Sequence, residues 1–168
     1  MNYAYCPQCG KKGSVVEENQ THSRCSNCGT DFWNNPRAAM SVLFINDKGE
    51  LLFGKRAFEP EKGKYDFPGG FVEYNEDLFD AAVREVEEET GILIDKRDLE
   101  LITTYTLEYM PGVSAIDLIL VAKKWEGRFK ASDDVAELEW KPLSFIYDEA
   151  FRPAYPGLEA KISRYLPS

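Results

Sequence analysis

The chain has 168 residues, of which 43% are hydrophobic and 13% aromatic, so it can bury one substantial core and a small appendage. The net charge of −9 argues against bulk electrostatic attraction to nucleic acid. No run of 18 apolar residues occurs, and the N-terminal MNYAYCPQCG lacks the apolar segment of a secretory signal. We therefore expect a cytoplasmic protein without a membrane span and without a nucleic-acid partner.

All four cysteines lie in two C-x2-C pairs, Cys6/Cys9 and Cys25/Cys28, with 15 residues between the pairs. Four thiolates complete the tetrahedral shell of Zn²⁺, and a two-residue gap lets one tight turn supply two of them. Two disulfides are the alternative, which the lack of a secretory context disfavours. His22, the single histidine, is expected at the surface because the zinc shell is already complete.

The cysteine spacing therefore predicts a zinc ribbon over residues 1–36, folded by its metal. Whether the ribbon also serves dimerisation or substrate binding is left open by the sequence. A linker that contains Pro36 leads to a second domain over residues 37–168. Nearly all of the negative charge lies in this domain, because residues 1–37 hold four Lys or Arg against three Asp or Glu.

Runs of β-branched, aromatic and aliphatic residues predict the strands of the second domain. Residues 38–45 and 50–56 are expected to form a hairpin around a turn at 46–49. A tight turn is expected at Pro68-Gly69-Gly70, where the absence of side chains lets a ligand approach the backbone. Further strands are expected at 65–67, 98–109, 113–125 and before Pro142, with short helices at 143–150 and 158–166.

A helix is predicted over residues 77–90 by the segment GFVEYNEDLFDAAVREVEEETGI. Asn75 or Glu76 is expected near its N-cap, and Gly91 follows its end, where a left-handed residue is favoured. At about 100° per residue, one arc of this helix is apolar and faces a core. The arc consists of Leu78, Phe79, Ala82 and Val86.

Three glutamates of this helix, Glu85, Glu88 and Glu89, gather beside the apolar arc at i, i+3 and i+4. Asp80 and Glu87 point to the opposite side. Carboxylates at the edge of a core are costly unless paired, and Mg²⁺ or Mn²⁺ would remove the cost because hard cations prefer oxygen ligands. A solvated acidic face is the alternative, which the helical geometry alone does not exclude.

The segment 70–92 also matches every fixed position of the pattern G-x5-E-x7-R-E-U-x-E-E-x-G-U, in which U is aliphatic. This pattern is the Nudix box, so the chain resembles the Nudix hydrolase family. The resemblance implies an α+β fold, an α/β/α sandwich with a mixed β-sheet, preceded here by the small zinc-ribbon β module. The matching residues are Gly70, Glu76, Arg84, Glu85, Val86, Glu88, Glu89, Gly91 and Ile92.

The resemblance also implies roles for individual residues. Glu85, Glu88 and Glu89 would bind the catalytic Mg²⁺ or Mn²⁺ together with the carbonyl of Gly70. Glu88 is the expected general base, and an acid near Glu137 is the rival. Asp133 and Asp134 are further candidates for that acid.

Supporting and substrate-binding roles follow from the same resemblance. Arg84 is expected to pair with Glu76 and to fix the loop and helix without touching the reacting atoms. Arg56 ends its strand where family members meet a substrate phosphate, and a surface salt bridge is the alternative. Gly69 and Gly70 are expected to line the substrate site.

A four-cysteine ribbon before a Nudix domain is similar to the NADH, FAD and ADP-ribose pyrophosphatases. The array S-Q-P-W-P-F-P-x-S of the NADH group is absent, and residues 103–112 read TTYTLEYMPG instead. We expect hydrolysis of the pyrophosphate bond in a nucleoside diphosphate linked to another moiety, by a homodimer. The alternatives are a nucleotide-sensing or RNA-binding module, a (d)NTP pyrophosphohydrolase, and an enzyme similar to isopentenyl-diphosphate isomerase.

Overall fold

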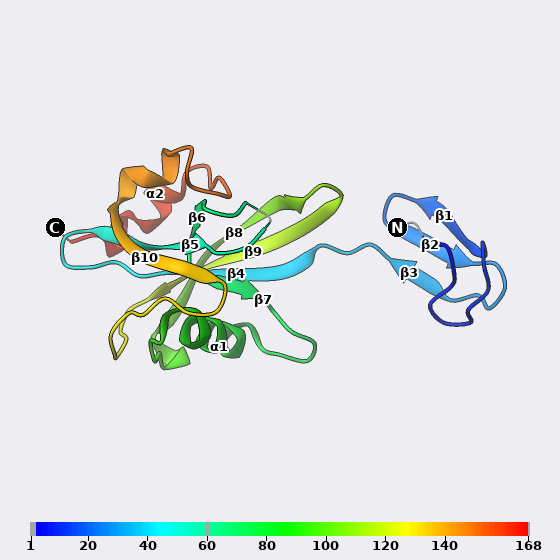
Figure 1. Ribbon diagram of the computed structural model, residues 1–168, viewed down its shortest axis with the longest axis horizontal. Helices are drawn as coiled ribbons and strands as arrows, with labels where there is room; N and C mark the ends of the chain where they lie inside the picture. Colours follow the sequence, from blue (N-terminus) through cyan, green and yellow to red (C-terminus); the bar gives the residue numbers. More distant parts are fainter. Residues whose placement is uncertain (1–2, 60, 168) are drawn as a thin grey trace. The chain divides into compact units, whose positions relative to one another are not determined.

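The computed structural model describes residues 3–59 and 61–167, which divide into two compact units, Met1–Pro36 and Arg37–Ser168. The first unit contains an antiparallel sheet of β1 (Val15–Asn19), β2 (His22–Cys25) and β3 (Asp31–Trp33), in that order (Figure 1). One tight turn precedes β1 and a second connects β2 to β3. They are closed by hydrogen bonds from the Gly10 N–H to the Cys6 carbonyl and from the Gly29 N–H to the Cys25 carbonyl, both 2.9 Å.

The second unit is built on two neighbouring sheets. The larger has the order β7-β4-β9-β8, in which β4 and β9 run parallel and the other pairs antiparallel. The smaller has the antiparallel order β10-β5-β6. The strands are β4 (Arg37–Leu43), β5 (Glu50–Arg56), β6 (Tyr65–Asp66), β7 (Gly69–Phe71), β8 (Leu99–Met110), β9 (Val113–Ala122) and β10 (Val135–Pro142).

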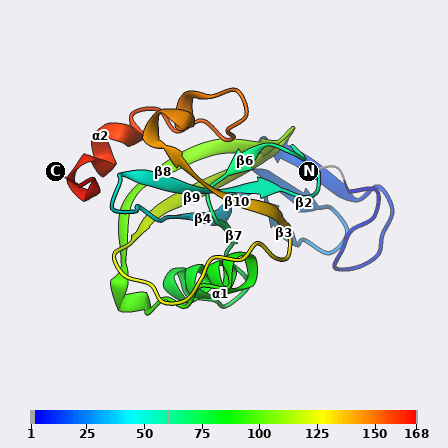
Figure 2. The same cartoon turned by 60° about the vertical axis from the view of Figure 1, so that its left-hand side comes forward.

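Helical segments cover both faces of these sheets (Figures 1 and 2). The helix α1 (Leu78–Thr90) packs on one face, where Met40, Val42, Phe44 and Val86 belong to one core. The opposite core combines strand residues with the C-terminal segments. Those segments are η2 (Leu143–Tyr147), α2 (Leu158–Ile162) and η3 (Ser163–Tyr165), and η1 (Lys96–Asp98) precedes β8.

Strand side chains alternate between the two cores because successive residues of a strand point to opposite faces. In β4, Val42 faces the core below α1 and Leu43 faces the core below α2. The predicted α/β/α sandwich with a mixed sheet is therefore confirmed. No helix among residues 3–59 and 61–167 is long and apolar enough to cross a membrane.

The predicted hairpin of residues 38–45 and 50–56 is wrong. The turn forms, with the Gly49 N–H donating to the Asn46 carbonyl at 2.9 Å, but the strands separate beyond the bridge between Ile45 and Leu51. β4 pairs instead with the distant β9 over seven residues, and β5 pairs with β10. These long-range pairings place both strands in the middle layer, where helices cover both faces, and a local turn signal carries no information about them.

Two residues of the predicted turn Pro68-Gly69-Gly70, Gly69 and Gly70, belong instead to the edge strand β7. Gly69 and Gly70 pair with Ser41 and Met40 of β4. Gly69 has φ of 148°, and a Cβ on it would lie 2.1 Å from the Met40 carbonyl oxygen. The glycine is therefore required by the close approach of the two strands.

Two expected helices also differ from the structure. Of residues 143–150 only Leu143–Tyr147 is helical, as the 3₁₀ segment η2, and α2 ends at Ile162, where η3 continues it. Leu158 and Ile162 are buried, as the apolar spacing predicts, but only five residues are α-helical. An amphipathic pattern therefore indicated the buried face correctly and overestimated the helix length.

Candidate active site and metal sites

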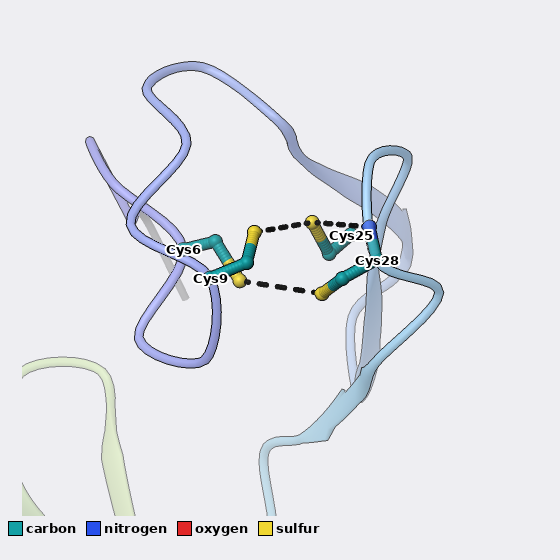
Figure 3. A group of neighbouring side chains, drawn as sticks. All are labelled: Cys6, Cys9, Cys25 and Cys28. Carbon is teal, nitrogen blue, oxygen red and sulfur yellow. Dashed lines mark hydrogen bonds between the residues drawn. The ribbon is translucent and has the colours of Figure 1, made fainter.

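The four cysteine side chains of the first unit converge from two turns and point toward one another (Figure 3). Their sulfur atoms all lie within 4.8 Å of one another. The pairs Cys6–Cys28 and Cys9–Cys25 have Sγ–Sγ distances of 3.9 and 3.8 Å, too long for disulfides. Four convergent sulfurs form the soft, tetrahedral donor set that Zn²⁺ prefers, so these residues fit a zinc ion.

The local environment favours the thiolate of Cys25. Its side chain is 3.2 Å from the Ser14 hydroxyl, and the Cys28 N–H donates to its sulfur at 3.5 Å. These two contacts lower the pKa of Cys25 to about 6. Burial has the opposite effect on Cys6, whose pKa rises to about 11. A bound cation would offset the cost of ionising the buried thiol.

His22 is more enclosed than predicted, because its side chain is only 12% exposed. Its ring stacks on Trp33 with a centroid distance of 4.2 Å, and its Nε2 is 2.8 Å from Asp31 Oδ1. The other ring nitrogen is 3.1 Å from Glu18 Oε2. The imidazole therefore ties β2 to its neighbours and is not part of the cysteine group.

The acidic helix α1 is fixed at both ends by its own sequence. Asp77 is the N-cap and accepts a hydrogen bond from the Phe79 N–H at 2.9 Å. Gly91 adopts a left-handed conformation with φ of 66°, and its N–H donates to the Glu87 carbonyl at 2.9 Å. The N-cap is thus one residue later than the expected Glu76, whose side chain pairs with Arg84 instead.

Arg84 connects the helix to the loop before it. Its Nε and Nη2 donate to the two carboxylate oxygens of Glu76 at 2.8 and 2.9 Å, a bidentate pair. Nη1 donates to Glu85 at 2.9 Å and to Glu88 at 3.2 Å, and Nη2 also reaches the Phe71 carbonyl at 3.3 Å. The pair with Arg84 lowers the pKa of Glu76 to about 2. The predicted Arg84–Glu76 pairing is present.

A cavity of ≈ 290 Å³ opens beside α1. Strands β4, β7, β8 and β9 and the segments 66–67, 133–134 and 153–155 line it. One basic side chain, Arg56, stands among seven carboxylic acids in the described lining. The acids are Asp66, Glu73, Glu85, Glu89, Asp117, Asp133 and Asp134.

Glu85 and Glu89 enter this cavity from α1. Glu89 is only 5% exposed, and its Oε2 accepts a hydrogen bond from the Gly69 N–H at 2.8 Å. Burial raises the pKa of Glu89 well above its usual value, and the nearby carboxyls of Asp134 and Glu85 raise it further. Burial also raises the pKa of Glu85 despite its hydrogen bond from Arg84.

Gly70 provides the space for this arrangement. A Cβ on Gly70 would lie 2.5 Å from the carboxyl carbon of Glu85. Glu85, Glu89 and Asp134 line the same cavity, where Arg84 and the Gly69 N–H offset only part of the repulsion among their carboxyls. This donor set fits a hard divalent cation, which would offset that repulsion.

The structure separates the other predicted residues. Glu88 is not among the lining residues; its side chain is 49% exposed and receives its hydrogen bond from Arg84. Glu137 is also outside the lining and lies 3.7 Å from Lys55 Nζ. Arg56, Gly69 and Gly70 line the cavity, and Arg56 Nη1 is 3.8 Å from Asp66 Oδ2.

Three lining acids were not predicted from the sequence, Asp66, Glu73 and Asp117. Asp117 is only 3% exposed and accepts hydrogen bonds from Ser41 Oγ at 2.9 Å and Tyr155 OH at 2.6 Å. A signal for it was present, because Asp117 is the single charged residue in the apolar run VSAIDLILVA. A charge in the middle of a buried strand indicates a function or a buried polar network.

The three-layer fold and the acidic, glycine-lined cavity fit a hydrolase that works with a divalent cation. The NUDIX domain model matches residues 35–161, so the chain belongs to the Nudix domain family and is a Nudix hydrolase.

Three similar proteins cover different parts of the chain. An ADP-ribose pyrophosphatase of Methanocaldococcus jannaschii is 33% identical over 117 residues, which span 70% of this chain and 68% of that protein. The NAD-capped RNA hydrolase NudC of Vibrio atlanticus is 36% identical over 87% of this chain, which spans about half (52%) of that relative. The crystal structure of a NUDIX hydrolase from Nitrosomonas europaea has a TM-score of 0.68 at 25% identity and covers 97% of this chain and 90% of its own.

Proposed function

We propose that this protein hydrolyses the pyrophosphate bond of an adenosine diphosphate linked to another moiety, with ADP-ribose as the representative substrate. The observation that carries the proposal is the convergence of Glu85, Glu89 and Asp134 beside Arg56 in one cavity. A diphosphate needs its negative charge offset at the point of attack, and this cavity offers carboxylates for a cation and a guanidinium for a phosphate.

Mg²⁺ or Mn²⁺, when bound, would screen the phosphate charge and activate a water molecule. Glu85, Glu89 and the Gly70 carbonyl would hold this ion, with Asp134 as the additional carboxylate. The Glu88 side chain is 49% exposed and bonds to Arg84, so it can turn inward as ligand or general base. Asp134, which lines the cavity, is a stronger rival for the base than the more distant Glu137.

Arg56 is assigned to the substrate phosphates, because it is the cation of the described cavity lining. Arg84 has a positioning role: it orients Glu85 and Glu88 and holds the loop through Glu76. Cys6, Cys9, Cys25 and Cys28 are assigned to a structural Zn²⁺ that supplies folding energy to the first unit.

The substrate class is supported by the names of two relatives, which mention ADP-ribose and NAD, and both compounds contain an adenosine diphosphate unit. The cavity adds apolar wall residues, among them Leu107, Phe71 and Tyr109, that suit a flat base beside the diphosphate. An acidic domain also suits a substrate that binds through a metal ion more than one that binds through its own phosphates alone.

The test measures AMP release from ADP-ribose, NADH and FAD with Mg²⁺ or Mn²⁺, beside dinucleoside polyphosphates and dNTPs. Glu89→Gln should lower kcat/KM on the order of 10³-fold with the fold retained. Glu87→Gln is the matched control, because Glu87 is exposed on the outer side of α1, and it should match the wild type. Turnover of dNTPs alone would favour a (d)NTP pyrophosphohydrolase. Tight nucleotide or RNA binding without turnover would favour a nucleotide-sensing or RNA-binding module.

A further inference from the structure

The floor of the cavity contains a buried carboxyl group that the hydrolysis does not use. Asp117 belongs to β9, where Ala115 and Asp117 point to the cavity and Ile119 continues into the core below α2. Its neighbours across the sheet are Ala39 on β4 and Tyr105 on β8. The small Ala39 and Ala115 side chains leave the space above this floor open.

The two oxygens of Asp117 have different surroundings. Oδ2 accepts hydrogen bonds from both Ser41 Oγ and Tyr155 OH, at 2.9 and 2.6 Å. Oδ1 is buried and has no hydrogen-bond partner among residues 3–59 and 61–167. Leaving an acceptor unpaired at such a site is costly, so the group is arranged for a donor that the protein itself does not supply.

Ser41 and Tyr155 set the orientation of this acceptor. Both hydroxyls donate to the same oxygen, so the carboxyl plane is fixed and Oδ1 remains for a ligand. Tyr155 is itself held by its ring contacts with Tyr105 and Phe67, at centroid distances of 5.2 and 5.7 Å. A rigid acceptor at the base of a cavity is a specificity element, because an ill-fitting ligand leaves it unpaired.

We propose that Asp117 Oδ1 accepts a hydrogen bond from the exocyclic amino group of the substrate's adenine ring. This inference rests on the proposed function, which supplies an adenosine diphosphate. Asp66 and Asp117 line the same cavity, and Glu85 lies against Gly70 of β7. The next residue, Phe71, pairs with Ala39, which is the β4 neighbour of Asp117. Arg56 stands next to Asp66 at 3.8 Å. A nucleotide with its diphosphate near Glu85 and Arg56 would therefore extend its base toward Asp117.

The walls at this end favour a base over a ribose. Phe71 and Tyr109 contact each other with a centroid distance of 5.0 Å, and Leu107 and Ala115 are opposed across the sheet. These apolar and aromatic surfaces suit the face of a purine, with Asp117 at its edge. A ribose would need several polar partners there.

Calorimetric binding of AMP, of purine riboside 5′-monophosphate, which lacks the amino group, and of 2′-deoxy-AMP tests the assignment without turnover. Wild-type protein should bind AMP about tenfold to a hundredfold more tightly than the purine analogue. The variant D117N is isosteric and presents an amide in place of the carboxylate, so this ratio should fall to about one. The variant Glu87→Gln should keep the wild-type ratio.

Equal wild-type affinities for AMP and the purine analogue would overturn the assignment, whatever the variant does. A loss confined to 2′-deoxy-AMP would overturn it in favour of a ribose hydroxyl. Turnover of ADP-ribose in the same preparation separates the two proposals. An active enzyme that binds AMP and the purine analogue equally refutes the adenine contact alone. Tighter binding of AMP without turnover of ADP-ribose refutes the hydrolase proposal alone.

Discussion

The two adjacent glycines of β7 provide a test that separates folding from chemistry. Gly70 does not have a left-handed φ, so its backbone accepts alanine, but the added Cβ would lie 2.5 Å from the Glu85 carboxyl carbon. Ordinary contact begins at 3.4 Å, so the carboxylate must move by about 1 Å. A displacement of that size can cost about 10²-fold in rate, while stability should change by less than about 1 kcal/mol.

Gly69→Ala is the matched control for Gly70→Ala. Its Cβ would lie 2.1 Å from the backbone oxygen of Met40, at a φ of 148° that side chains rarely adopt. Backbone cannot yield as a carboxylate can, so we expect a loss of about 3 kcal/mol, or roughly 10 °C in Tm. Thermal unfolding without added Mg²⁺ or Mn²⁺, together with ADP-ribose hydrolysis in their presence, distinguishes the two variants. A Gly70→Ala enzyme with wild-type turnover, or one as unstable as Gly69→Ala, refutes the reasoning.

Three further predictions concern other parts of the molecule. Because Arg84 lowers the pKa of Glu76 to about 2, the contribution of Glu76 to the stability of the folded state is complete above pH 4.5 and is lost as the pH falls toward 2. Glu76→Gln should therefore reduce the pH dependence of the free energy of unfolding over this window, measured by denaturant titration. Asp134→Asn should weaken Mn²⁺ binding by calorimetry about tenfold to a hundredfold, with no comparable loss in a Lys55→Ala control. Cys25→Ser should release zinc, measured by elemental analysis, and unfold the first unit; an unchanged zinc content contradicts the four-thiolate site.

Local sequence features of α1 were predictable because they depend on neighbours along the chain. The spacing of Leu78, Ala82 and Val86 predicted the helix, and Gly91 its end. The same holds for the cysteine turns. The pairing partners of β4 were not predictable, because the β9 residues that pair with it lie 78 residues further along the chain, and a turn at 46–49 gives no information about them. Strand pairing is decided by burial of the whole middle layer, not by the nearest turn.

The candidate site shows the same division between local and distant information. A helical projection placed Glu85, Glu88 and Glu89 together, since it describes one helix in isolation. In the structure Glu88 stays exposed and bonds to Arg84 of its own helix, whereas Glu89 is distinguished by a contact distant in sequence, the Gly69 N–H. Asp117 depended entirely on such contacts, because its partners are separated from it by 76 and 38 residues.

The donor arrangement of Arg84 explains how one arginine can hold the loop and still release a glutamate. The pair with Glu76 uses Nε and Nη2, so only Nη1 serves Glu85 and Glu88. Glu88 can therefore turn toward a cation without loosening the loop. Lysine offers one compact ammonium and cannot form the bidentate pair, so Arg84→Lys would force these two tasks to compete for the same nitrogen.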